Sequence, residues 1–199
     1  MDDELEMVKY LINNSYTEGC GIMIPSLDDD YRLNILLDTV SKYRNLCGLQ
    51  DRGEITKLSE FFWHTHSNVK DAEGKEGKGY PSPQDIFKAV KSGKKYNIVF
   101  TPWGAWSMYS NRPIDESLAE KKRENFYLIV EVNYNDKLYF QSNEGRMKIT
   151  ADNNVIQMEI IQKYIRHLTR YINSTYGTDF HMKFEPWYLI EREEHFVIN

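Results

Sequence analysis

The sequence predicts a single α/β domain in which a mixed β-sheet carries helices on its faces. Short apolar segments of strand length alternate along the chain with longer amphipathic segments of helical period. Neither an internal repeat nor a change of composition divides the 199 residues, and this length suits one domain. Hydrophobic residues make up 41% and charged residues 28%, which is usual for a soluble globular protein. No apolar run approaches the ~20 residues that span a bilayer, so we expect no membrane partner.

The first half of the chain predicts two helices and two strands. Ser82 is a favourable N-cap, Pro83 suits the first helical turn, and Gly93 is a typical helix end. Residues 27–44 are ambiguous, because the leucine spacing favours a helix while the β-branched residues also allow a strand. The expected elements are a helix from Asp3 to Leu11, a buried strand from Cys20 to Ile24, a strand from Ser59 to His66 and a helix from Pro83 to about Val90.

The second half predicts one long helix among shorter elements. Val155 to Asn173 is the clearest helix of the chain, since its isoleucines and leucines recur with the helical period. The apolar run from Phe126 to Val132 predicts a strand, followed by a turn at residues 133–136 and a return strand from Leu138 to Phe140. The remaining expected elements are strands at Tyr96–Phe100, Trp106–Tyr109 and His181–Phe184, a short helix at Glu116–Arg123 and a charged C-terminal tail.

Two segments are expected to modify this domain. Residues 71–79 are rich in glycine and charge, so we predict a mobile surface loop there and place a flexible insertion at about 68–80. A helix and a strand from about residue 154 onward form a predicted C-terminal extension.

Charge and cysteine content narrow the expected partners and compartment. The net charge of −5 disfavours a nucleic-acid partner. The two cysteines, Cys20 and Cys47, form neither a zinc-ligand pair nor a disulfide framework, which predicts a reducing compartment, the cytoplasm or the nucleus. The acidic N-terminal residues argue against a secretory signal. Residues with AT-rich codons are common, as in some protists and large DNA viruses, so a virus particle is a further expected location.

The strongest functional signal is a pair of histidines two positions apart at the end of an apolar run. Residues i and i+2 of a strand point to the same face, so His64 and His66 would direct both imidazoles one way. Asp85 lies on the first turn of the following helix and could complete a His-His-Asp set. Such a set suits Zn²⁺ and leaves the fourth tetrahedral position for a water whose pKa falls toward ~7. Glu18, just before the first strand, is a candidate proton carrier.

The order Glu18, His64-x-His66 and Ser82-x-x-Asp85 resembles the signature of the JAMM (MPN-plus, JAB-like) zinc metalloproteases. The resemblance covers roughly residues 5 to 110. It implies an αβα domain around a curved mixed sheet, of the MPN/JAB-like and cytidine-deaminase-like kind. It also implies hydrolysis of isopeptide or peptide bonds, with a ubiquitin or ubiquitin-like conjugate as the protein substrate and Zn²⁺ as the cofactor.

The same resemblance implies a role for each residue of the signature. The two histidines and Asp85 would bind zinc, and Glu18 would take a proton from the metal-bound water and hand it to the leaving amine. Ser82 would donate a hydrogen bond to the oxyanion of the reaction. The chain departs from the family at two points. Ser67 stands where family members have proline, and the nineteen positions from His66 to Asp85 exceed the usual spacing.

Each motif also has an ordinary explanation. His64-Thr65-His66 alone is typical of a half-exposed strand, and Ser82-Pro83-Gln84-Asp85 alone is typical of a helix cap, so their joint occurrence carries the metal-site hypothesis. Two other functions stay open. One is a catalytically inert MPN-like scaffold in a multiprotein assembly, such as a large-DNA-virus particle, and the other is a zinc hydrolase of small molecules. His181 and His195 have no partner at ligand spacing, so we expect no second metal site.

Overall fold

The structure is a computed structural model of the chain, which describes residues 2–14, 18–25, 33–37, 61–67, 79–93, 95–137 and 154–193. Its elements, in chain order, are α1 (Asp2–Asn14), β1 (Cys20–Pro25), β2 (Leu33–Leu37), β3 (Phe61–Thr65), α2 (Pro83–Ser92), β4 (Tyr96–Thr101), β5 (Gly104–Ser110), α3 (Glu116–Lys137), α4 (Asn154–Tyr176), β6 (Phe180–Pro186) and α5 (Trp187–Glu193).

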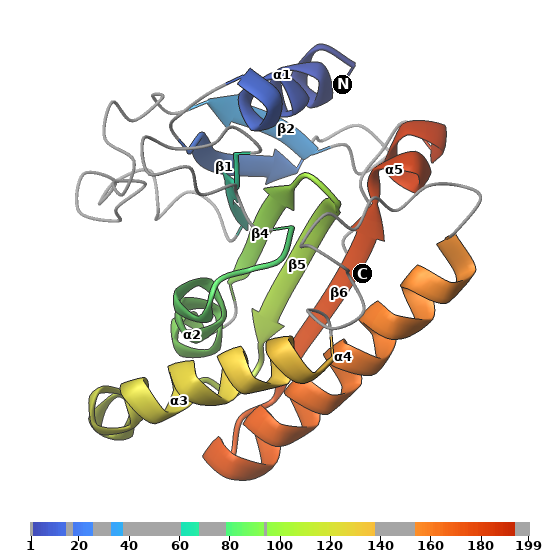
Figure 1. Cartoon of the computed structure of the whole chain (residues 1–199). Helices are drawn as coiled ribbons and strands as arrows, with labels where there is room; N and C mark the ends of the chain where they lie inside the picture. The colour runs from blue at the N-terminus through green and yellow to red at the C-terminus, as the bar shows by residue number, and fades with distance from the viewer. Residues whose placement is uncertain are drawn as a thin grey trace.

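Six strands form one open sheet in the order β2-β1-β3-β4-β5-β6. β3 and β4 run parallel, with α2 between them in the chain, and the other neighbouring strands run antiparallel. The predicted mixed α/β architecture, with helices against the sheet, is therefore confirmed (Figure 1). Its specific JAB-like form stays a prediction. β6 pairs with β5, so the strand predicted in the C-terminal extension belongs to this sheet.

The helices cover both faces of the sheet. α2, α3 and α4 pack on one face, where Trp106 and Phe126 are buried. α1 and α5 pack on the other face, where Trp63 and Phe100 are buried. Side chains alternate between the faces along each strand, so His64, next to Trp63, belongs to the face that carries α2.

Most of the predicted elements are confirmed to within a few residues. These are the first helix, the buried first strand, the strand that ends at the histidines, the helix after Ser82, the long helix and the strands now labelled β4, β5 and β6. Within the ambiguous stretch 27–44, residues 33–37 form the strand β2, which pairs with β1.

The largest error of the sequence prediction concerns α3, which is one continuous helix of 22 residues. The strand expected from Phe126 to Val132 and the turn expected at 133–136 are both helical. Phe126 and Val130, one helical turn apart, are buried against the neighbouring helices, whereas Leu128 and Val132 are 58% and 48% exposed. Apolar side chains on both sides of the helix hide its period and make the run look like a buried strand.

The C-terminal tail is also more ordered than predicted, because residues 187–193 form α5. Trp187 stacks on Phe100 with ring centroids 6.0 Å apart, and its indole N–H donates to the carbonyl of Thr101 at 2.7 Å. The return strand expected at Leu138–Phe140 lies outside the described residues, as does most of the insertion expected at 68–80. No helix among the described residues is both long and apolar enough to cross a membrane.

Cys20 is buried in β1 and is disulfide-bonded. The sequence predicted no disulfide framework, and it did not anticipate the disulfide of Cys20. The other cysteine, Cys47, lies outside the described residues. Because structural disulfides persist mainly in oxidising compartments, the cysteine content no longer supports a reducing compartment.

Candidate metal centre

The two histidines of the motif lie at the carboxyl end of β3. In β3, His64 pairs with Cys20 of β1 on one side and with Val99 of β4 on the other. His66 is the first residue after β3, and its backbone N–H donates to the carbonyl of Phe100 at 2.8 Å. The extended backbone thus continues through His66, so both imidazoles lie on the α2 face, as predicted.

Asp85 is held in place by the cap of α2. Ser82 is the N-cap, with φ −68° and ψ 161°, and its hydroxyl oxygen accepts from the backbone N–H of Asp85 at 3.2 Å. In return, the backbone N–H of Ser82 donates to Asp85 Oδ2 at 2.8 Å. This reciprocal capping box fixes the carboxylate at the helix N-terminus, where the helix dipole favours a negative charge.

The structure brings the three predicted ligands together. Nε2 of His64 lies 3.2 Å from Asp85 Oδ1, and Nε2 of His66 lies 3.2 Å from Asp85 Oδ2. One ligand atom from each of the three residues lies within 4.8 Å of the others. In a tetrahedral zinc site with bonds of about 2.0 Å, neighbouring ligand atoms are about 3.3 Å apart. Two imidazoles and a carboxylate at these separations therefore fit a metal ion.

The environment of Asp85 favours its ionised form. The side chains of His64, His66 and Asp85 are only 17%, 9% and 17% exposed. Burial alone raises the pKa of the Asp85 carboxyl, but the charges of the two imidazoles and their hydrogen bonds outweigh it. They hold the pKa of this carboxyl well below its usual value. The aspartate is therefore a charged ligand at neutral pH.

The segment that leads into α2 is anchored by buried tryptophans. The carbonyl of Gly79 accepts from the indole N–H of Trp106 at 2.9 Å and from the Thr101 hydroxyl at 3.0 Å. A Cβ at Gly79 would lie 2.2 Å from the ring of Trp103. The sequence prediction placed Gly79 in the flexible insertion and missed this anchoring role. The one signal in the sequence was the presence of a glycine shortly before the N-cap. The anchor fixes the path by which Asp85 reaches the histidines.

The register of β1 and β3, extended to the residues before β1, places Glu18 opposite His66. Past β1 the pairing continues, because Thr65 N–H donates to the carbonyl of Gly19 and Gly19 N–H donates to the Thr65 hydroxyl, both at 2.8 Å. The next pair in this register is Glu18 and His66. A Cβ at Gly19 would meet Leu11 of α1, so alternation directs Glu18 to the opposite face, which carries the metal ligands. The role of Glu18 as a proton carrier stays a prediction.

Ser82 is engaged in this structure with Asp85. Its hydroxyl oxygen lies 2.6 Å from Asp85 Oδ2, so the hydroxyl proton is donated to the carboxylate. A hydroxyl carries one proton, so donation to an oxyanion requires the Ser82 hydroxyl to rotate. The oxyanion role stays a prediction. The observed contacts orient Asp85, because Ser82 binds Oδ2 while Oδ1 faces His64.

Comparisons with known proteins assign the chain to no family. No family model, no curated protein and no solved structure matches the chain. The resemblance to the JAMM metalloproteases rests on the order of the motif residues.

Proposed function

We propose that the chain is a zinc-dependent hydrolase of JAMM type, which cleaves an isopeptide or peptide bond of a ubiquitin or ubiquitin-like conjugate. One observation carries the proposal. Two imidazoles at the end of β3 and a carboxylate on α2 meet with both N–O distances at 3.2 Å, in a mostly buried site. Three protein ligands of this kind leave one coordination position open, as catalytic zinc sites do and structural zinc sites do not.

The surrounding residues suit hydrolysis. A zinc ion held by His64, His66 and Asp85 would supply a water of lowered pKa and would polarise the scissile carbonyl. Glu18, one position beyond the Gly19–Thr65 pair, accepts the proton of the nucleophile and delivers it to the leaving amine. Ser82 keeps the carboxylate of Asp85 oriented through the capping box. The site also lies beyond the carboxyl end of a parallel strand, where open α/β sheets usually bind their ligands.

A cleavage assay on the full chain tests this function. The zinc-loaded protein is incubated with ubiquitin chains of different linkage and with ubiquitin-like fusions. We expect cleavage that stops with a chelator and returns with zinc. Glu18→Gln should lower the rate by at least about 100-fold, as loss of a general base does, with zinc content unchanged. Glu159→Gln, at an exposed position of α4, is the matched control.

Two outcomes contradict parts of the proposal. Full activity in Glu18→Gln removes Glu18 from the mechanism. A chain that holds zinc at these ligands but cleaves none of the conjugates is not a ubiquitin hydrolase, and the inert scaffold then accounts better for the site.

A further inference from the structure

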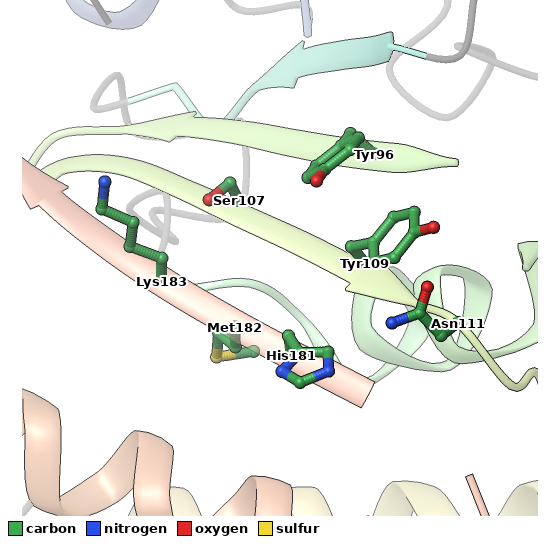
Figure 2. A pocket seen from close by; sticks show the side chains of 7 residues that line it. All are labelled: Tyr96, Ser107, Tyr109, Asn111, His181, Met182 and Lys183. Carbon is green, nitrogen blue, oxygen red and sulfur yellow. The ribbon is translucent and has the colours of Figure 1, made fainter. Parts of the chain in front are cut away.

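The sheet face that carries α1 and α5 has a hollow beyond the area that these helices cover. The helices pack over Phe100 of β4 and Ala105 of β5. Further along the same face lie Tyr96 of β4 and Ser107 and Tyr109 of β5. With side chains of β6 they line a hollow of about 390 Å³ (Figure 2). This volume falls in the range of small-molecule sites.

One wall of the hollow carries Tyr96 of β4 and Tyr109 of β5, and their ring stack continues beyond the hollow to Phe61 of β3. The Tyr109 ring stacks on Tyr96, with centroids 4.5 Å apart and planes 23° apart. Tyr96 in turn stacks on Phe61 of β3, with centroids 5.1 Å apart and planes 13° apart. Each ring restrains the next, so the wall is formed before any ligand arrives, and little ordering entropy is lost on binding.

The opposite side of the hollow is polar and carries one lysine. His181 and Lys183 project from β6 (Figure 2). His181 Nε2 lies 2.9 Å from Asp179 Oδ1, and the amide of Asn111 donates to Asp179 Oδ2 at 3.0 Å, which braces this rim. None of the described residues that line the hollow is an aspartate or a glutamate. Lys183, the one lysine among the described lining residues, can bind an anionic group of a ligand.

We propose that this hollow binds a planar ring that carries an anionic group, of the size and chemistry of a nucleoside monophosphate. The aromatic wall offers a stacking surface to any nucleobase. The Lys183 ammonium neutralises the phosphate, and Ser107 and Asn111 offer hydrogen bonds to polar edges. A neutral sugar would not use the ammonium, and inorganic phosphate would not use the rings. The hollow and the metal ligands lie on opposite faces of the sheet, so this site does not depend on the proposed hydrolysis.

Calorimetric titration of the full chain with AMP and UMP tests the proposal. We expect saturable binding of at least one nucleotide, about tenfold weaker binding of its uncharged nucleoside, and none of inorganic phosphate. Lys183→Met should lower nucleotide affinity to that of the nucleoside and remove its salt dependence. Tyr109→Leu should weaken both ligands by about tenfold or more. Lys163→Met and Tyr171→Leu, at exposed positions of α4, are the matched controls.

Several results would overturn the assignment. One is the lack of saturable binding by both nucleotides, and another is unchanged affinity in both Lys183→Met and Tyr109→Leu. Glucose or maltose binding as tightly as the nucleotides would also overturn it, because charge would then play no part. Circular dichroism verifies that each variant folds. If Tyr109→Leu does not fold, the salt dependence of Lys183→Met decides the question.

Discussion

In the described part of the chain two aspartates contact histidines, Asp85 on one face of the sheet and Asp179 on the other. On the α2 face, Asp85 lies 3.2 Å from each of two imidazoles, and the three side chains are at most 17% exposed. On the other face, Asp179 lies 2.9 Å from His181, and these side chains are 46% and 62% exposed. The shorter contact is therefore the more exposed one.

The comparison shows that the length of a histidine–aspartate contact does not distinguish the candidate metal site from a surface pair. Both aspartates have a lowered pKa, but the causes differ. For Asp179 the leading cause is the hydrogen bond from Asn111, and water screens the charge of His181. For Asp85, two imidazoles overcome the opposing effect of burial. The candidate site differs from an ordinary surface pair in two ways. Two imidazoles converge on one carboxylate, and a helix cap holds this carboxylate in a mostly buried position.

Removing one imidazole from each aspartate should give the largest contrast in zinc binding. His66→Ala leaves zinc with two ligands, so we expect loss of bound zinc, beyond the ~10–100-fold weakening caused by loss of an indirect partner. His181→Ala should leave zinc content unchanged. Metal analysis after gel filtration, with a competing chelator to rank affinities, measures both. Equal zinc content in the two variants would refute the ligand assignment.

Acid unfolding of the zinc-free protein should separate the two aspartates next. The pKa of Asp85 is depressed by folding, so its ionisation contributes stability above its usual pKa near 3.8, and this contribution is lost as the pH falls through the folded value. In Asp85→Asn the contribution is absent, so the gap in the free energy of unfolding between wild type and variant should narrow below about pH 4.

Asp179→Asn should show a smaller change with pH, because Asp179 is exposed. Urea titrations with a chelator present, at several pH values from 6 to 3, measure the gap for both variants. A gap for Asp85→Asn that stays constant over this range would contradict the depressed pKa.

A glycine precedes each aspartate, and the two glycines should differ in what an added methyl group disturbs. Gly79→Ala places Cβ 2.2 Å from the Trp103 ring, and overpacking of this kind costs about 1–3 kcal/mol. Gly177→Ala meets no atom within 4 Å but forces alanine to φ +65°, at about 1 kcal/mol. Thermal unfolding measures stability, and chelator competition should show weaker zinc binding in Gly79→Ala alone.

The smallest contrast concerns the groups that hold each carboxylate. Ser82→Ala removes a helix cap, which costs about 0.5–2 kcal/mol, and should weaken zinc binding by about 10–100-fold. Asn111→Ala removes an exposed hydrogen bond to Asp179 and should change stability by less than about 0.5 kcal/mol. If Ser82→Ala retains both its stability and its zinc affinity, the capping box does not orient Asp85.

The candidate ligands could be predicted because their signals are local. A spacing of two puts His64 and His66 on one face of any strand, and Ser82-x-x-Asp85 has the form of a helix cap wherever a helix follows. The proximity of Asp85 to the two histidines depends on long-range packing, and it was expected only from the order of the motifs. The anchoring of Gly79 by Trp106 could not be predicted, because the two residues are 27 positions apart and no local pattern links them.

The strand prediction for part of α3 failed because the deciding interactions are not local. Local propensity favours a strand in an apolar run with β-branched residues. Burial of Phe126 and Val130 between α2 and α4 selects the helix instead, and that packing is not visible in the run itself. The metal ligands are therefore easier to predict from this sequence than the secondary structure of α3. The ligands follow from short sequence spacings, whereas the helical form of α3 depends on packing against neighbouring helices.

The capping box gives Ser82 and Asp85 a second task, since the helix needs them whether or not an ion is bound. The imidazoles of His64 and His66 have no comparable duty in starting a helix. In descendants of this protein that abandon metal binding, selection would release the histidines first and retain the serine and the aspartate. A surviving Ser-x-x-Asp in such a lineage is then a record of folding, and the histidine pair is the better marker of retained chemistry.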